Sequence, residues 1–511
     1  LFYYPIQRYN NYMRSLEQIR QVIKELYLSD QIPWIVGYSG GKDSTATLQL
    51  IWEVLSSIDK KDRHKEVHVL TNDTLVENPI VSLWVEESHR KIREQALKEE
   101  LPIVSQMTMP EVNDSFWVNL IGRGYPAPRP KFRWCTQRLK IKPSNKYVLD
   151  VVNKNGEAIM ALGTRKAESA ERKKVIEKYE KSTREHLSRN HDPKFDRVWI
   201  FAPIKEWTND DVWEYLATYD NPWGHKNSDL MTMYRGATKD NECPLVVDSS
   251  TPSCGDSRFG CYVCTLVDKD KSMSAMIQND DEKSWMTPLA EFRNRYLDIK
   301  NDHQHRNFRR SNGSLTVMKD KANDGYKLVP GAYKQSYRHL LLTELLKAQE
   351  EVKASGVEGT QNFEIIRHKE LEEIRRIWIE DKNEIEDALP DIYLESTGSQ
   401  FETKARFEQK LSKEDIFYLK ENIAQSDDDI HYQLIRNLLS TEAKYSHSQR
   451  RVGIYDEIEK LLTRGCFENY EDALSFALKN QKHKFENIEQ DNVIKLKFVN
   501  NTDITNDDAE I

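Results

Sequence analysis

The sequence predicts an α/β protein built on a doubly wound parallel sheet, followed by a helical C-terminal region. Short apolar runs alternate with longer amphipathic segments through the first 220 residues, which is the pattern of strands joined by crossover helices. A glycine-rich segment directly follows the first apolar run, as expected where a parallel strand ends at a ligand. Beyond residue 331 only helical periodicity remains.

The expected elements follow one another in chain order. Residues 8–30 have apolar side chains at helical spacing and predict an amphipathic helix. The apolar runs that predict strands are 34–36, 67–70, 102–104, 158–162 and 198–201, and the segments that predict helices between them are 45–55, 79–100 and 137–153. Residues 166–196 are rich in Lys, Glu, Arg and Ser, and we interpret them as a flap over the site or a solvated loop.

The length of 511 residues predicts two to four domains. We expect a nucleotide-binding domain over 1–230 and a cysteine-rich region over 231–330. A helical region over 331–486 and a poorly ordered acidic tail over 487–511 complete the chain.

Composition narrows the class of function. The chain has 75 basic and 83 acidic residues, a net charge of -8, which excludes a generally basic coat for nucleic acid. Local basic patches such as 306–310 and 172–181 stay candidates for DNA binding, although such runs are often solvated faces. No apolar run is long enough to span a membrane, and no leader pattern is present. We therefore expect a cytoplasmic protein, in which six cysteines favour metal binding over disulfides.

The glycine-rich segment is Ser39-Gly40-Gly41-Lys42-Asp43-Ser44. Two glycines let the backbone approach an anion, and the start of the following helix offers unpaired N–H groups. The Walker A pattern requires glycine where this chain has Val36, and serine or threonine where it has Asp43. The loop therefore predicts phosphate binding of a different class.

The loop resembles the SGGxDS loop of the ATP-pyrophosphatase family, whose fold is adenine nucleotide α-hydrolase-like and which cleaves ATP between its α- and β-phosphates. The resemblance implies that Ser39, Ser44 and the loop amides hold pyrophosphate and that Lys42 neutralises charge. It also implies that Asp43 positions Mg²⁺ or the loop itself. The residues expected to bind ATP are Ser39, Gly40, Gly41, Lys42, Asp43, Ser44, Asp73, Thr74 and Gly163.

Three later segments are similar to motifs of phosphoadenylylsulfate reductase-like proteins. They are Arg133-Trp134-Cys135-Thr136-Gln137-Arg138-Leu139-Lys140 preceded by Arg129-Pro130, Gly163-Thr164-Arg165-Lys166-Ala167-Glu168-Ser169 with Arg172, and Pro203-Ile204 through Trp207 to Asp211-Val212-Trp213. Each has a structural interpretation when taken alone, such as a helical ion pair between Glu168 and Arg172, but they occur in the family's order. We expect Arg165 and Arg172 to contact the α-phosphate or substrate, because a guanidinium matches phosphate geometry. Cys135 is expected to carry a persulfide or thiolate, or to pack in the core.

Four of the six cysteines lie within 22 positions: Cys243, Cys254, Cys261 and Cys264. Clustered thiolates suit a tetrahedral metal site or a cubane cluster. A zinc site usually shows two tight pairs of ligands, and this segment has one, so the spacing favours a 4Fe–4S cluster over zinc and over unliganded thiols. Cys466 stands alone in a helical region and is interpreted as a core residue.

The combination of parts resembles the DndC family, the ATP-using components of bacterial DNA phosphorothioation. The resemblance implies that ATP, with Mg²⁺, adenylates a backbone phosphate oxygen of DNA, which sulfur from a cysteine desulfurase then replaces. DNA, the desulfurase and the other phosphorothioation subunits are the implied partners. The chain ends Asp507-Asp508-Ala509-Glu510-Ile511, without the Glu-Cys-Gly-type tail of sulfate-reducing relatives. Reductase-like or tRNA-thiolating chemistry, and a non-catalytic nucleotide-sensing iron–sulfur subunit, remain the alternatives.

Overall fold

The computed structural model describes most of the chain in segments. These are residues 3–130, 132–180, 186–190, 192–237, 259–297, 299–310, 312–320, 325–403, 411–423, 430–446, 450–465, 467 and 469–480. Cys243, Cys254, Cys466 and the predicted tail at 487–511 lie outside them. The chain divides into two compact units. Unit 1 comprises Leu1–Asn119, Ala127–Ile299 and Glu344–Glu370, and unit 2 comprises Leu120–Pro126, Lys300–Thr343 and Leu371–Ile511.

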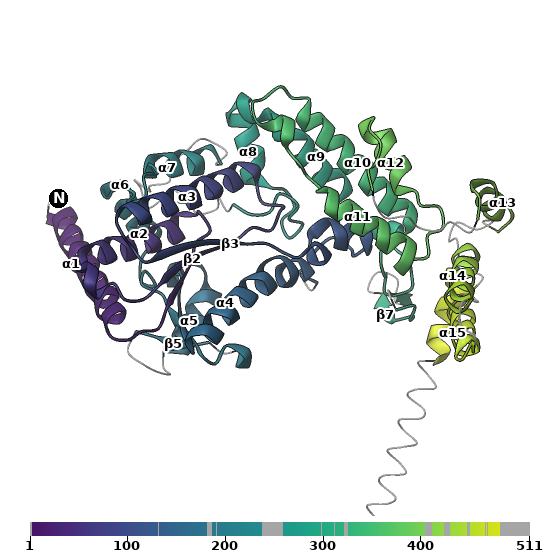
Figure 1. Cartoon of the computed structure of the whole chain (residues 1–511), viewed down its shortest axis with the longest axis horizontal. Helices are drawn as coiled ribbons and strands as arrows, with labels where there is room; N and C mark the ends of the chain where they lie inside the picture. The colour runs from purple at the N-terminus through teal and green to yellow at the C-terminus, as the bar shows by residue number, and fades with distance from the viewer. Residues whose placement is uncertain are drawn as a thin grey trace, which may run out of the picture. The chain divides into compact units, whose positions relative to one another are not determined.

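Unit 1 is built on a six-stranded sheet in the order β3-β2-β1-β4-β6-β5 (Figure 1). Its strands are β1 (Trp34–Gly37), β2 (Val67–Asn72), β3 (Ile103–Thr108), β4 (Ala158–Ala161), β5 (Ser188–Arg189) and β6 (Val198–Phe201). All neighbours pair in parallel except β5, which runs antiparallel to β6 at the edge. The predicted α/β class with a mostly parallel sheet is confirmed.

The central strands are buried on both faces, which explains why they read as continuous apolar runs rather than as alternating ones. Trp34, Ile35 and Val36 in β1 are fully buried. Ile35 packs against Val148 and Val152, which belong to the helix at residues 142–155, in one apolar cluster. Burial of this kind is the main stabilising contribution to such a layered domain.

Helices lie on both faces of the sheet. The helices of unit 1 up to residue 299 are α1 (Tyr3–Leu28), α2 (Lys42–Ser57), α3 (Pro79–Lys98), α4 (Lys142–Asn155), α5 (Ala170–Glu180), α6 (Asn209–Thr218), α7 (Asn227–Gly236), α8 (Lys271–Asn279) and α9 (Thr287–Tyr296). Figure 1 shows α2, α3, α6 and α7 on one side of the sheet and α4 on the other. Local signals set their starts: Asn78 caps α3 ahead of Pro79, and Thr208 and Asp211 form a capping box on α6.

The charged segment 166–196 differs from the expected flap or loop. Residues 170–180 form α5, and Ser188 pairs with Ile200 across the β5–β6 ladder. The sequence did not predict α5 because a helix that is exposed on most of its sides needs few apolar residues at helical spacing. It did not predict β5 because that strand is only two residues long. Residues 181–185 and 191 lie outside the described part of the chain.

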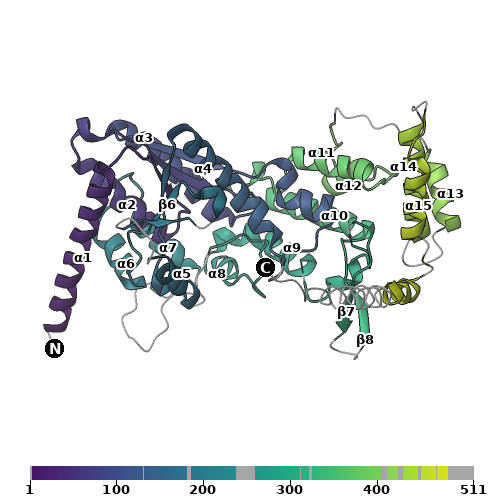
Figure 2. The same ribbon diagram turned by 90° about the horizontal axis from the view of Figure 1, so that it is seen from below.

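Unit 2 and the segment Glu344–Glu370 of unit 1 contain the described part of the helical region predicted over 331–486. Its helices are α10 (Gln335–Lys353), α11 (His368–Arg376), α12 (Leu389–Thr397), α13 (Lys413–Ile423), α14 (Ile430–Tyr445) and α15 (Ile454–Gly465). A hairpin of β7 (Val317–Asp320) and β8 (Gly325–Leu328) precedes this region. Helices α14 and α15 lie side by side in both views (Figure 2). None of the described helices combines the length and the apolar character that crossing a lipid bilayer requires.

Candidate active site

Three strand ends meet at one edge of the sheet in unit 1. Strand β1 pairs in parallel with β2 on one side and with β4 on the other. The carboxyl ends of the three strands therefore share an edge, and the strand order reverses at β1, where ligands of such sheets bind. The segments that follow these strands carry most of the sequence-predicted site residues.

The loop after β1 is closed by its own serines. The Ser39 amide donates to Ser44 Oγ at 3.1 Å, and the two hydroxyl oxygens lie 3.2 Å apart. Ser44 Oγ in turn donates to the Gly41 carbonyl at 2.9 Å. Gly40 has φ +72°, and a Cβ there would lie 2.5 Å from Val85 Cγ2, so the position requires glycine. Gly41 caps α2 without any side-chain acceptor, as in helix starts that receive a phosphate.

A buried ion pair ties this loop to the segment after β4. Arg165 Nε donates to Asp43 Oδ1 at 2.7 Å, and Arg165 Nη1 donates to the Trp207 carbonyl at 3.3 Å. Lys42 Nζ lies 3.3 Å from the other oxygen of Asp43. The Asp43 carboxylate is thus shared by two cations, which is the arrangement of a residue that fixes the loop. Arg165, which is predicted to contact the α-phosphate or the substrate, is 3% exposed and donates to Asp43.

Gly163 brings the two segments into backbone contact. A Cβ on Gly163 would lie 2.7 Å from the Asp43 carbonyl oxygen and 3.0 Å from the Ser44 amide nitrogen. Only glycine allows this approach, so Gly163 packs directly against the backbone of the glycine-rich loop. Arg172 lies in α5, but its side chain is outside the described part of the structure.

Tyr234 completes the loop's surroundings and is a residue that the sequence does not reveal. The Lys42 amide donates to Tyr234 Oη at 3.3 Å, and Lys42 Nζ lies 5.4 Å from the centre of the ring. Burial raises the pKa of the Tyr234 hydroxyl, so it stays protonated. The only sequence signal is indirect, because Trp213 of the third motif packs edge-on against this ring.

Asp73 and Thr74, which are predicted to bind ATP, make hydrogen bonds within the protein. Asp73 Oδ1 accepts the Leu75 amide at 2.8 Å, and burial raises the pKa of this carboxyl. Thr74 is fully buried, and its hydroxyl donates to Glu77 Oε1 at 2.9 Å. The same hydroxyl lies 3.4 Å from Cys261 Sγ. The end of β2 therefore connects to the cysteine-rich segment.

Cys261 and Cys264 lie on a turn that is fixed at several points. The Cys264 amide donates to the Cys261 carbonyl at 3.0 Å. The segment pairs with the chain after β2, since the Tyr262 amide donates to the Val76 carbonyl at 3.1 Å. Arg293 of α9 donates to the Cys264 carbonyl at 2.7 and 3.1 Å and to the Asp268 and Val267 carbonyls.

Cys135 shares this neighbourhood. Burial raises the pKa of Cys135, and Cys264 adds to the effect. Burial likewise raises the pKa of Cys261 to about 12, with a contribution from Glu77. Lys140 Nζ lies 3.3 Å from Glu77 Oε1. Burial acts to lower the pKa of Lys140, but Glu77 and the nearby thiols outweigh it, so the ammonium stays charged beside the cysteines.

Thiolate sulfur is the donor that iron–sulfur clusters and structural zinc both prefer, so the cysteine turn fits either group chemically. Within the described segments, no three His, Cys, Asp or Glu side chains are arranged to hold a metal ion. The structure places Cys261 and Cys264 together, while their predicted partners Cys243 and Cys254 are outside the described residues.

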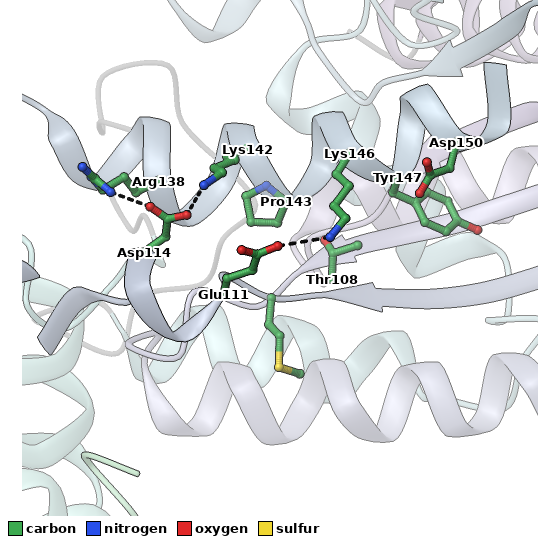
Figure 3. Close-up of a pocket in the computed structure, with 10 residues that line it drawn as sticks. Thr108, Glu111, Asp114, Arg138, Lys142, Pro143, Lys146, Tyr147 and Asp150 are labelled. Atoms are coloured by element: carbon green, nitrogen blue, oxygen red, sulfur yellow. Dashed lines mark hydrogen bonds and ion pairs between the residues drawn. The ribbon is translucent and has the colours of Figure 1, made fainter. Parts of the chain in front are cut away.

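A cleft of about 260 Å³ lies beside the segment that carries Cys135 (Figure 3). Its cations are neutralised within the cleft. Arg138 and Lys142 both contact the buried Asp114, and Lys146 Nζ lies 3.1 Å from Glu111 Oε1. The cleft therefore fixes the start of α4 to the chain after β3 and offers little free positive charge to a ligand.

Residues 33–225 match the family model of the phosphoadenosine phosphosulfate reductase domain. Over 202 residues the chain is 26% identical to an uncharacterized protein of Methanocaldococcus jannaschii. This match covers 39% of the present chain and 35% of that protein, so it spans about a third of the relative's own length.

Two solved structures overlap with the chain at low scores. Phosphoadenylyl-sulfate reductase from Candida auris, in a phosphate complex, is 12% identical and has a TM-score of 0.26 over 39% of this chain and 78% of that one. The U34-tRNA thiolase NcsA from Methanococcus maripaludis, with its 4Fe–4S cluster, is 13% identical and has a TM-score of 0.27 over 57% and 81%.

The fold and the loop define an α/β domain with a glycine-rich loop at the switch point of a mostly parallel sheet. Within that class, the chain contains a phosphoadenosine phosphosulfate reductase-like domain over residues 33–225.

Proposed function

We propose that this chain, like the DndC family, uses ATP to activate a phosphodiester oxygen of DNA and then replaces that oxygen with sulfur. The observation that carries the proposal is that the predicted phosphate loop (residues 39–44) and the cysteine turn (residues 261–264) both lie at the C-terminal ends of the parallel strands. The loop follows β1, and Cys261 contacts Thr74 and lies 3.7 Å from Glu77 at the end of neighbouring β2. A phosphate site beside cysteines suits activation followed by attack of sulfur. The match of residues 33–225 to a reductase domain of sulfur metabolism supports this chemistry.

In the first step, a non-bridging oxygen of a DNA phosphate attacks the α-phosphorus of ATP. An oxygen–phosphorus bond forms, the bond between the α- and β-phosphates breaks, and pyrophosphate leaves. Ser39, Ser44 and the start of α2 hold the departing pyrophosphate, and Lys42 offsets its charge. Asp43 orients Lys42 and Arg165. Mg²⁺, when bound, neutralises further phosphate charge.

In the second step, sulfur displaces AMP. A cysteine desulfurase supplies the terminal sulfur of a persulfide on Cys135, which attacks the adenylated phosphorus as the sulfur nucleophile. The phosphorus–sulfur bond forms, and the activated oxygen leaves with AMP. Two thiols of a cellular reductant then cleave the remaining sulfur–sulfur bond and are oxidised to a disulfide, which releases phosphorothioate and regenerates Cys135. Lys140 stabilises thiolate charge beside Cys135.

The proposed ligands of a 4Fe–4S cluster are Cys243, Cys254, Cys261 and Cys264, with zinc as the alternative. Such a cluster would supply soft iron atoms that favour sulfur ligands. Arg293 holds the turn of Cys261 and Cys264 in a fixed shape, so two of the four ligands would be preorganised. We further propose that the protein is cytoplasmic and works with the desulfurase and the other phosphorothioation subunits.

A second candidate function is reduction of an adenylylated sulfate, which the description of the matching domain favours. Reduction of an adenylylated sulfate by thiols releases sulfite and a nucleotide but no pyrophosphate. Pyrophosphate release from ATP that DNA stimulates therefore supports phosphorothioation, whereas thiol-dependent release of sulfite from an adenylylated sulfate supports reduction. Pyrophosphate release that tRNA stimulates would make tRNA the substrate in place of DNA.

The decisive experiment measures AMP, pyrophosphate and sulfur incorporated into DNA with all partner proteins present. We expect a Ser39→Ala, Asp43→Ala double variant to lose at least 100-fold in rate, on the order seen when positioned charge-stabilising groups are removed. The matched control is Ser57→Ala with Asp59→Ala, which are exposed and lie at the opposite end of α2. Normal sulfur incorporation by the loop variant would sink the proposal.

Metal analysis tests the cluster separately. Protein purified without oxygen should hold about four iron atoms per chain, and Cys261→Ser should lower that number while Cys466→Ser leaves it unchanged. One zinc per chain would instead give the cysteines a structural role.

A further inference from the structure

Unit 2 contains a second cleft, of about 560 Å³, which the ATP-dependent chemistry does not use. Its walls come from residues 307, 309, 310, 312 and 313, from residues 332–335 and 338 at the start of α10, from residues 381–384, and from α14 and α15. All these segments belong to the same compact unit. The cleft is therefore built by parts of the chain that are far apart in sequence.

The lining of this cleft is strongly basic. Among the described residues that line it, eight are Lys or Arg and three are Asp or Glu. The whole chain, in contrast, has a net charge of -8. A local excess of cations on an acidic chain is an electrostatic footprint for an anionic ligand.

Two buried arginines have guanidinium nitrogens without partners. Arg338 is 3% exposed; its Nη2 pairs with Glu384, but Nε and Nη1 have no hydrogen-bond partner. Arg436 is 4% exposed; Nη1 donates to Gln335 Oε1 at 2.7 Å and to Glu386 Oε2 at 3.4 Å, and Nε has no hydrogen-bond partner. Buried donors without acceptors are costly. Both residues line the cleft, where an oxyanion would satisfy them.

The rim of the cleft adds exposed charge. Arg310, Lys444 and Lys460 are exposed and line its outer part. The cleft beside Cys135 differs, because three cations and three carboxylates line it and it has no excess of positive charge (Figure 3). Buried fork-shaped donors below several exposed cations suit a chain of phosphodiesters better than a single small anion.

The structure also refines the basic patch at 306–310. Arg306 Nε donates to the Gly331 carbonyl at 2.8 Å, and Phe308 is buried in an apolar cluster. Arg309 and Arg310 line the cleft. Part of the patch therefore supports the fold, and the rest contributes to the basic surface.

We propose that the basic cleft of unit 2 binds backbone phosphates of DNA. The choice of DNA as the ligand rests on the proposed function, but the binding itself requires neither ATP nor sulfur. The two ideas therefore fail in different experiments.

The test is binding of a fluorescently labelled DNA duplex to the full chain, followed by anisotropy over a range of salt concentrations. Arg310→Gln, Lys444→Gln, Lys460→Gln is the rim variant, and these exposed positions put little of the fold at risk. We expect it to weaken binding at least tenfold and to reduce the salt slope by about 1 for each phosphate that the protein no longer neutralises. The matched control is Lys61→Gln, Arg93→Gln, Lys98→Gln, three exposed cations of unit 1, which should bind as the parent chain does.

Unchanged affinity and salt slope in the rim variant would overturn the proposal. Inorganic phosphate and ATP are run as unlabelled competitors. If either displaces the duplex at equal phosphate concentration, the cleft is a site for small anions and the proposal is also wrong. The Ser39→Ala, Asp43→Ala variant should retain DNA binding. Rim-dependent binding without sulfur incorporation by the parent chain would leave this inference standing while the proposed function fails.

Discussion

Asp43 and Arg165 show how a single contact joins stability to function. The Arg165 guanidinium is almost entirely buried, and its Nε lies 2.7 Å from the Asp43 carboxylate. Removing one partner of a buried pair leaves an uncompensated charge, which costs far more than the pair itself contributes. The residue that shapes the phosphate loop is therefore also one on which the local fold depends.

Asp43→Asn should lower the free energy of unfolding by about 3 kcal/mol, because the Arg165 charge loses its counterion. Urea unfolding followed by tryptophan fluorescence measures the change. The control is Glu206→Gln, whose exposed carboxylate pairs with Lys166 and whose removal should cost less than about 1 kcal/mol. Equal destabilisation of both variants would contradict the structural role given to Asp43.

Gly163→Ala tests the backbone approach of the β4 segment to the start of α2. The new methyl group would lie 2.7 Å from the Asp43 carbonyl oxygen, so the loop must shift. We expect a decrease of about 1–3 kcal/mol in stability and weaker ATP binding by calorimetry. Gly236→Ala is the matched control, since a Cβ there meets nothing within 4 Å. If Gly163→Ala binds ATP as tightly as Gly236→Ala, Gly163 has no part in shaping the loop.

Helix α9 acts on the cysteine turn through one side chain. Arg293 donates to the carbonyls of Cys264, Val267 and Asp268, an arrangement that a lysine ammonium cannot reproduce in the same planar geometry. Arg293→Lys should therefore reduce the metal retained after chelator treatment by at least half. Arg295→Lys on the same helix is the control, because Arg295 is exposed and pairs with Glu291 one turn away. If both variants retain the same amount of metal, Arg293 does not stabilise the metal site.

Helices and strands differ in how well the sequence predicts them. β1 is predictable because a strand buried on both faces is apolar without interruption, and β2 because only His68 interrupts its apolar run over 67–70. The phosphate loop is predictable because its residues are consecutive. Tyr234 and Arg293 are not, since each reaches its hydrogen-bond partner across a long sequence separation and looks locally like an ordinary helical residue. Edge strand β5 escapes notice because two residues carry no period.

The distribution of charge over the molecule gives the acidic composition a different meaning. A net charge of -8 excludes a generally basic surface, yet the cleft of unit 2 gathers an excess of cations from distant segments. The run 306–310 supplies only Arg309 and Arg310 of these cations, because the others come from the start of α10, from Lys382 and from α14 and α15. The net negative charge of the chain limits nonspecific attraction to nucleic acid, so we expect DNA binding to depend on the cleft.

Lys382 should make DNA binding depend on pH. Burial and the adjacent Arg338 lower the pKa of Lys382 to about 7, although Glu384 and Asp381 act in the opposite direction and Arg123 adds to the lowering. A bound phosphodiester is anionic and favours the charged ammonium, so the pKa of Lys382 rises on binding. Below pH 7 Lys382 is protonated in both states and the affinity is constant. Above pH 7 the free protein loses this proton, and binding must restore it.

The association constant for the DNA duplex should therefore fall as pH rises above 7, by at most about tenfold per pH unit, until the higher pKa of the bound state is reached. Anisotropy titrations between about pH 6.5 and 9 at fixed ionic strength measure it, since DNA phosphates do not titrate in that range. Lys382→Arg, charged throughout, should bind without this dependence, and Lys382→Met should bind more weakly with a flat profile. A parent profile that matches that of Lys382→Arg would show that Lys382 does not face the DNA.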